Sequence, residues 1–180
     1  MKFTYSIPTK ILFGPGSFND LATTPLPGKK ALVVITAGKS MRANGYLDRL
    51  IDMLDKQGIG HALFDKILPN PVLRHVHEGA ALAREQGCDF VIGLGGGSSI
   101  DSAKSIAVMA KNPGDYWDYI SGGSGKGQPP ERRPPIVAIA TTAGTGTEAT
   151  RDRHPKRTPT RRSASAARKP SPCSPWWTRK

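Results

Sequence analysis

A run of glycines near the middle of the chain has the residue types of a phosphate-binding turn. Four glycines within residues 93–97 follow the apolar residues 90–92, and Ser98 then opens a segment with helical periodicity. The first turn of a helix has free backbone N–H groups and a partial positive charge, so it attracts anions. Glycine lets the backbone approach a phosphate because it has no Cβ atom. The segment predicts an anion site formed by Gly95, Gly96, Gly97 and Ser98.

The same residues also have a purely structural interpretation. Ser98 and Asp101 are spaced as in a capping box, in which two side chains satisfy free N–H groups at the start of a helix. Capped glycine turns are common without any ligand, so this segment alone leaves a structural turn and a nucleotide site equally open. It is not the G-x-G-x-x-G fingerprint, because its glycines are adjacent and no third glycine follows at the required spacing.

Alternating strands and helices are predicted on both sides of this turn. Continuous apolar runs predict buried strands, and a 3.6-residue period that ends at glycine predicts helices. This order is typical of a Rossmann-like α/β fold, a parallel sheet with helices on both faces. The predicted strands are residues 3–7, 10–13, 31–36, 61–64, 90–92 and 136–140, and the predicted helices are 17–21 (a short turn), 46–57, 72–86 and 98–109.

Polar or small residues follow three other predicted strands. Residues 37–40 come after strand 31–36, Asn70 lies between two prolines beyond strand 61–64, and residues 141–145 follow strand 136–140. Ligands of parallel sheets lie outside the carboxyl ends of the strands. We therefore expect these segments to meet the glycine turn at one nucleotide site.

Four motifs in order give the chain a resemblance to the iron-containing (group III) alcohol dehydrogenases. They are Phe13-Gly14-Pro15-Gly16, Pro69-Asn70-Pro71, the string G-G-G-S-x-x-D-x-x-K at 95–104, and T-T-A-G-T-G-T-E at 141–148, where Thr147 replaces the usual serine. The resemblance covers residues 1 to 150 and implies a dehydroquinate synthase-like N-terminal domain. Glycerol dehydrogenases and dehydroquinate synthases share this architecture, but the motifs fit the alcohol dehydrogenases better.

The resemblance implies that this domain binds NADP or NAD. Many family members have an aspartate after the first strand of the sheet, which contacts the adenosine ribose. Ala37-Gly38 stands in that place, and Lys39 and Ser40 can bind a 2′-phosphate that an aspartate would repel, which favours NADP(H). The implied cofactor-binding residues are Ala37, Gly38, Lys39, Ser40, Asn70, Gly95, Gly96, Gly97, Ser98, Asp101, Thr141, Thr142 and Thr145.

The resemblance also implies a divalent metal, Fe²⁺ or Zn²⁺, which polarises the oxygen of a small alcohol or aldehyde during hydride transfer. The family holds it with one aspartate and three histidines of a C-terminal helical domain, which we expect to be missing here. His75 and His77 are two residues apart on a predicted helix and therefore point to different faces. We expect no metal ligands and no catalytic residues in this chain, which would be inactive alone. The full-length form is expected to be a homo-oligomer.

The positive charge of the chain is concentrated in residues 151–180. Ten of the 26 basic residues and one of the 14 acidic residues lie there, so the segment carries +9 of the net +12. It contains five prolines and no Leu, Ile, Val or Phe, so it cannot build a core. One interpretation is a non-catalytic nucleotide-binding module with a basic arm for nucleic acid, where Trp176-Trp177 stacks on bases. We favour an out-of-frame translation after codon 150, so nucleic acid is not expected as a partner.

The start of the chain has no signal-peptide pattern, and no apolar run approaches the ~20 residues of a membrane span. Two cysteines do not make a disulfide framework. These features predict a cytoplasmic protein without membrane contact.

Overall fold

The computed structural model describes residues 9–120, 124–132 and 134–149. Its centre is a four-stranded sheet with the order β2-β1-β3-β4, and every neighbouring pair is parallel. The chain builds β2 on one side of β1 and then crosses to build β3 and β4 on the other. The predicted parallel α/β sheet is confirmed, and its winding reverses between β1 and β3. The strands are β1 (Lys30–Thr36), β2 (Gly60–Ile67), β3 (Phe90–Gly95) and β4 (Ile136–Ala140).

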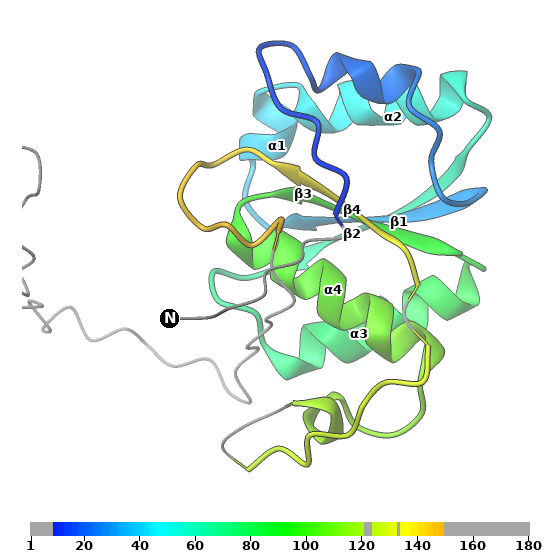
Figure 1. The fold of residues 1–180 in the computed structure, drawn as a ribbon, viewed down its shortest axis with the longest axis vertical. Coiled ribbons are helices and arrows are strands. Elements are labelled where there is room, and N and C mark those ends of the chain that lie inside the picture. The colour runs from blue at the N-terminus through cyan, green and yellow to red at the C-terminus, as the bar shows by residue number, and fades with distance from the viewer. Residues whose placement is uncertain (1–8, 121–123, 133, 150–180) are drawn as a thin grey trace, which may run out of the picture.

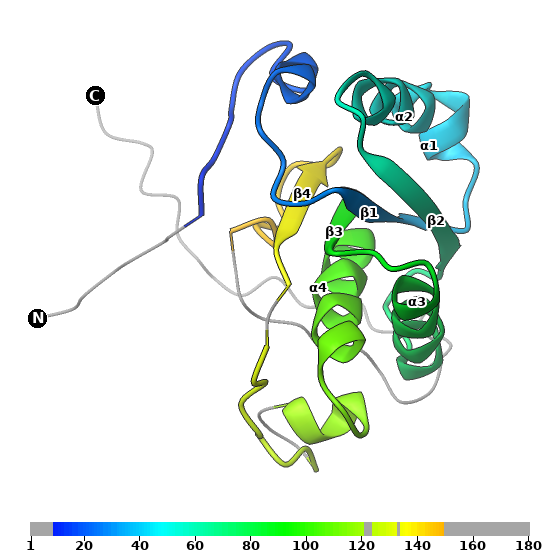
Figure 2. The ribbon, with the colours of Figure 1, turned by 90° about the vertical axis from the view of Figure 1, so that its right-hand side faces the viewer.

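Helices cover both faces of the sheet, as Figures 1 and 2 show. On one face lie α1 (Ser40–Ala43), α2 (Tyr46–Lys56) and the short 3₁₀ helix η1 (Asn19–Ala22). On the other lie α3 (Leu73–Glu85), α4 (Gly97–Lys111) and a second 3₁₀ helix, η2 (Tyr116–Tyr119). The helices therefore carry the chain back from the end of one strand to the start of the next, as parallel strands require.

Two hydrophobic cores form because alternate residues of β1 point to opposite faces. Val33 and Ile35 pack with Leu50 and Leu54 of α2 on one face. Leu32 and Val34 pack with residues of α3 and α4 on the other. Fully burying one such aliphatic side chain contributes about 1.5–3 kcal/mol to the stability of the fold. Because β1 buries side chains on both faces, it joins the two layers of helices through the sheet.

Helix α4 lies unusually close to the sheet at Gly93. A Cβ atom built on Gly93 would lie 3.0 Å from Cβ of Ala103 and 3.0 Å from Cα of Ile100. The glycine therefore sets the depth at which α4 packs on β3. Since α4 begins directly after β3, this contact also fixes the start of the helix relative to the sheet.

Asp89 anchors the other end of β1. Its carboxylate accepts hydrogen bonds from the backbone N–H groups of Lys29 at 2.8 Å and Lys30 at 3.0 Å. Partial burial raises the pKa of this carboxyl, but the hydrogen bonds from Lys29 and Lys30 outweigh it, and the pKa is lowered from its ordinary value.

Two predicted elements differ in the structure. Residues 10–13 do not form the predicted strand: they have no strand partner in the described part of the chain, and Phe13 is 97% exposed. A short apolar run alone cannot supply a neighbouring strand. The predicted strand 61–64 extends over Gly60–Ile67, because a register shift against β1 accommodates the polar residues Asp65 and Lys66. The predicted strand 3–7 and the tail 151–180 lie outside the described residues.

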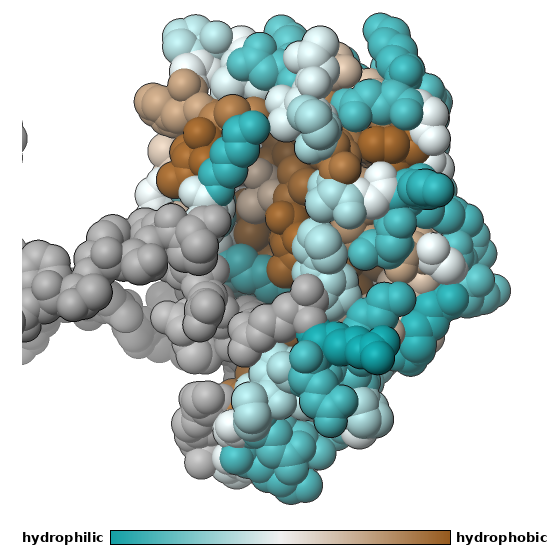
Figure 3. Space-filling model, turned by 45° about the vertical axis from the view of Figure 1, so that its right-hand side comes forward, coloured by the Kyte–Doolittle hydropathy of each residue, from teal (hydrophilic) through white to brown (hydrophobic). Residues whose placement is uncertain are grey.

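Strand β4 is one of the two edge strands of the described sheet and pairs there with β3 alone. Figure 3 shows apolar surface gathered in a hollow between polar margins on one face of the molecule. Large apolar side chains are exposed at Ile11, Leu12, Phe13, Leu68 and Ile136.

None of the helices among residues 9–120, 124–132 and 134–149 has both the length and the apolar content to cross a membrane.

Candidate nucleotide-binding site

The carboxyl ends of β1 and β3 form the point where the winding of the sheet reverses. Connections from these neighbouring strands leave toward opposite faces, so a crevice opens between them, and this is where doubly wound sheets bind ligands. The two connections are close: Sδ of Met41 in α1 lies 3.9 Å from the position that a Cβ on Gly95 would occupy. The topology thus places residues 37–40 and the glycine turn at the same edge of the sheet.

The glycine turn itself has a backbone that only glycine adopts easily. Gly95 has φ of +135°, and a Cβ there would lie 2.8 Å from Oγ of Ser99. Gly96 takes the N-cap position with extended backbone angles, and α4 begins at Gly97. The predicted capping box of Ser98 and Asp101 is therefore wrong. Because Gly96 already opens the helix, Ser98 lies inside the first turn, and no side chain caps it.

This geometry leaves two backbone N–H groups at the start of α4 without a partner among the described residues. The N–H groups of Ser99 and Ile100 donate to the carbonyl of Gly96 at 3.1 and 3.2 Å. No described residue accepts a hydrogen bond from the N–H groups of Gly97 or Ser98, which are free as expected at the start of a helix. Together with the helix dipole, they favour an anionic group at this position.

The threonine segment after β4 lies directly against the glycine turn. Its backbone is fixed by a hydrogen bond from Thr141 N to the carbonyl of Gly95 at 3.0 Å. A Cβ on Gly96 would lie 3.1 Å from Oγ1 of Thr142, and a Cβ on Gly97 would lie 3.2 Å from Cγ2 of Thr145. The hydroxyl-bearing side chains of Thr142 and Thr145 therefore border the free N–H groups, and both residues are exposed.

Asp101 binds the end of the threonine segment. Oγ1 of Thr147 donates to Oδ1 of Asp101 at 2.5 Å, and Nζ of Lys104 donates to the carbonyl oxygen of Thr147. Lys104 Nζ also lies 3.9 Å from Asp101 Oδ1. The role of Thr147 could not be predicted from the sequence, because a contact over 46 residues has no local signal. Of this group, only the helical spacing of Asp101 and Lys104 can be seen in the sequence.

Asn70 connects the turn after β2 to the same site. It is the one non-glycine residue with positive φ among the described residues, at +65°, a conformation that asparagine tolerates. Its backbone N–H donates to Oγ of Ser98 at 3.2 Å. The hydroxyl that the capping box would have used is thus oriented by the Pro69-Asn70-Pro71 turn instead.

These residues fit a dinucleotide phosphate but not a metal ion. Free N–H groups beside positions that a Cβ would fill form a cradle for an anion, and the nearby buried Oγ of Ser99 has no hydrogen-bond partner among the described residues. In contrast, the described part of the chain holds no group of three or more His, Cys, Asp or Glu side chains able to bind a metal. His61 lies in β2, and His75 and His77 lie in α3.

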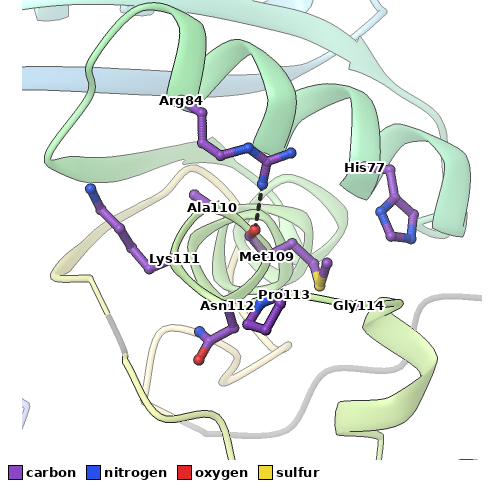
Figure 4. Close-up of a pocket in the computed structure, with 8 residues that line it drawn as sticks. All are labelled: His77, Arg84, Met109, Ala110, Lys111, Asn112, Pro113 and Gly114. Carbon is purple, nitrogen blue, oxygen red and sulfur yellow. Dashed lines mark hydrogen bonds between the residues drawn. The ribbon is translucent and has the colours of Figure 1, made fainter.

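A pocket of about 480 Å³, whose lining residues Figure 4 draws, contains none of the residues of this site. It sits at the carboxyl end of α4, roughly 20 Å along the helix from the glycine turn, given a rise of about 1.5 Å per residue. Arg84 there donates to the carbonyl of Met109 at 2.7 Å. Helix carbonyl groups disfavour anions, so the helix dipole does not favour a phosphate in this pocket. Its lining residues are His77, Arg84, Met109, Ala110, Lys111, Asn112, Pro113 and Gly114.

The fold defines a doubly wound α/β domain, a class in which ligands bind where the winding of the sheet reverses. The family profile of iron-containing alcohol dehydrogenases matches residues 8–153. The chain belongs to the iron-containing alcohol dehydrogenase family, as its motifs predict.

Relatives and solved structures agree with this assignment. The 1,3-propanediol dehydrogenase of Klebsiella pneumoniae is 37% identical over 151 residues, which are 83% of this chain and 38% of the relative. A crystal structure of NADH-dependent butanol dehydrogenase A from Thermotoga maritima has a TM-score of 0.72 at 35% identity, covering 82% of this chain and 36% of that one. An archaeal halo-thermophilic alcohol dehydrogenase from a Red Sea brine pool has a TM-score of 0.76 at 36% identity, covering 83% and 39%. The chain thus spans less than two fifths of the length of these proteins.

Proposed function

We propose that this domain binds a nicotinamide dinucleotide and forms the cofactor-binding half of a metal-dependent alcohol dehydrogenase or aldehyde reductase. The observation that carries the proposal is the pair of free N–H groups of Gly97 and Ser98 at the reversal point of the sheet. Relatives that act on butanol or 1,3-propanediol by their names favour a small alcohol, diol or aldehyde as the substrate.

In this proposal, the chain's own residues bind and orient the dinucleotide. The N–H groups of Gly97 and Ser98 donate to the pyrophosphate, and Asn70 holds the Ser98 side chain in place. The hydroxyls of Thr142 and Thr145, and Thr141 beside them, supply hydrogen-bonding groups for the adenosine half. The nicotinamide, when bound, supplies or accepts the hydride of the reaction.

We further propose that NADP(H) is preferred over NAD(H). Residues 37–40 contain no acid, all four are exposed, and Lys39 adds a positive charge. A carboxylate in this loop would repel a 2′-phosphate, whereas a lysine and a hydroxyl attract it. Several relatives and structural neighbours are NADH-dependent or bind NAD⁺ by their names, so the loop and not the family membership supports this preference.

We propose that the metal ligands and most of the substrate pocket belong to the part of the longer relatives that this chain does not cover. The proposal also keeps residues 151–180 as an out-of-frame segment, because their composition offers no apolar residues for a core. On this view the complete enzyme is a cytoplasmic homo-oligomer and the present chain binds the cofactor without turning over substrate.

Calorimetric titration of the 180-residue chain with NADP⁺ and NAD⁺ tests the binding proposal. The Gly97→Ala variant places a methyl group 3.2 Å from Thr145 and over the anion site, in a position where alanine suits the helix. The methyl group should hold the phosphate off a free N–H group, and the loss of that charge-assisted hydrogen bond should weaken both nucleotides by about tenfold or more. Gly60→Ala, whose Cβ meets only the flexible side chain of Lys30 and the Lys29 carbonyl, is the matched control and should bind as the parent does. Equal affinity in Gly97→Ala and the parent chain would contradict the proposal.

A further inference from the structure

Two charged residues at a bulge near the carboxyl end of β2 lie on opposite faces of the sheet. The register between β1 and β2 shifts between Val34 and Thr36, so that Asp65 and Lys66 together oppose a single residue of β1. Nζ of Lys66 lies 3.8 Å from Oε2 of Glu78 in α3, on one face. Oδ2 of Asp65 accepts a hydrogen bond at 2.7 Å from Arg42 in α1, on the other face. Bulges commonly re-aim side chains in this way next to binding sites.

The ion pair of Arg42 and Asp65 borders the loop that follows β1. Ala37 N donates to the carbonyl of Ile67 at 2.9 Å, which holds this loop against the end of β2. Met41, the neighbour of Arg42 in α1, lies beside Gly95 of the glycine turn. Figure 1 shows α1 at the same end of the sheet as the segment after β4. Arg42 therefore lies at the edge of the nucleotide site, on the side of residues 37–40.

Arg42 has binding capacity that its partner does not use. The pair is accessible, with 45% of the Arg42 side chain and 42% of the Asp65 side chain exposed. Asp65 accepts a hydrogen bond from one terminal nitrogen of Arg42, whereas a guanidinium carries five N–H donors in a planar fork. A second face of that fork matches a phosphate, which arginine binds with two parallel hydrogen bonds.

We propose that Arg42, held by Asp65, binds the 2′-phosphate of NADP(H) and is a specificity-determining residue of this site. The inference rests on the proposed function and extends it beyond Lys39 and Ser40. Asp65 orients the guanidinium and also partly cancels its charge, so the pair sets how strongly the site discriminates between the two dinucleotides. NAD(H) lacks the 2′-phosphate and gains nothing from Arg42.

Titrations of the full chain with NADP⁺ and NAD⁺ separate these roles. Arg42→Gln should weaken NADP⁺ binding by about tenfold and leave NAD⁺ binding within about twofold, because it removes a charge-assisted pair made to one ligand only. Asp65→Asn should strengthen NADP⁺ binding by about two- to fivefold, since it removes a nearby negative charge and keeps an acceptor for Arg42. Lys56→Gln removes the same charge at the far end of α2 and is the control, with both affinities unchanged.

The outcomes distinguish this inference from the proposed function. If the parent chain binds neither dinucleotide, both are wrong. If the parent binds them, but Arg42→Gln leaves the ratio of the two affinities unchanged or weakens both equally, the nucleotide site stands and the role of Arg42 is refuted. A selective loss of NADP⁺ affinity in Arg42→Gln, with no such loss in Lys56→Gln, supports the assignment.

Discussion

The hydroxyl of Thr147 donates a hydrogen bond to the carboxylate of Asp101 at 2.5 Å, and this contact ties the segment after β4 to the first turns of α4. Thr147 is 7% exposed, so its side chain lies within the fold. The position that the sequence assigns to the cofactor, Asp101, therefore has a clear structural partner. Through Thr147, Asp101 holds the threonines of the segment after β4 beside the glycine turn. We therefore expect Asp101 to affect cofactor binding by positioning these threonines.

Removing this contact should loosen the threonine segment. Thr147→Ala loses a hydrogen bond to a charged acceptor, so we expect about 1–2 kcal/mol less unfolding free energy and several-fold weaker NADP⁺ binding. Thr147→Ser keeps the hydroxyl and should retain most of both. Urea unfolding and nucleotide titration of the two variants measure these effects. Equal behaviour of Thr147→Ala and Thr147→Ser would show that the hydroxyl is unimportant.

The stability of the domain should depend on the protonation of Asp89. Its pKa is lowered in the folded state, so the unfolded chain takes up a proton first as the pH falls. The stabilisation is thus present above the ordinary value of 3.8 and is lost as the pH drops through the folded value. Asp89→Asn should cost about 1 kcal/mol at neutral pH, at the low end for charged hydrogen bonds because the residue is exposed. Urea unfolding between pH 3 and 7 should find this difference shrinking as the pH falls; a constant difference would argue against the assignment.

Metal addition should not give this chain dehydrogenase activity. The described residues offer no cluster of metal-binding side chains, and we place those ligands in the part of the family length that is not matched here. NADP⁺ or NAD⁺ with 1-butanol or 1,3-propanediol, in the presence of Fe²⁺ or Zn²⁺, should give no reduced nicotinamide absorbance above that of the buffer. Metal-dependent turnover by the purified 180 residues would overturn this placement.

The gene should carry the rest of the family domain in another reading frame. Residues 151–180 lack the apolar residues of a core, whereas the family match runs to residue 153. We expect the sequence downstream of codon 150, read in a shifted frame, to encode a helical domain with one aspartate and three histidines at metal-binding positions. Sequencing the gene answers this directly. A downstream sequence with no such domain in any frame rules the idea out.

The sheet and its helices were predictable because their signals are local. The apolar run 31–36 and the amphipathic pattern 46–57 correspond to β1 and α2 to within one residue. The four segments that follow strands could be assigned to one site because the carboxyl ends of parallel strands lie at the same edge of the sheet. The prediction failed at residues 10–13, whose pattern gave no information about a neighbouring strand.

Other parts of the site depend on contacts between distant residues. The start of α4 was misplaced because a glycine with extended backbone angles can take the N-cap position without any side chain. Arg42 and Asp65 are 23 residues apart, and the bulge that pairs them has no marker beyond two charged residues in a strand. Thr147 and Asp101 are separated by 46 residues. Such pairs become visible only when the fold is known.

The central claim is that the free backbone N–H groups at the start of α4 bind the phosphates of a nicotinamide dinucleotide. Two-dimensional NMR of the ¹⁵N-labelled chain, titrated with NADP⁺, tests it at the atoms concerned. We expect saturable chemical-shift changes that are largest at the amides of Gly97 and Ser98 and extend to residues 141–145. Absent changes, or changes centred on the pocket at Arg84 and Lys111, would contradict it.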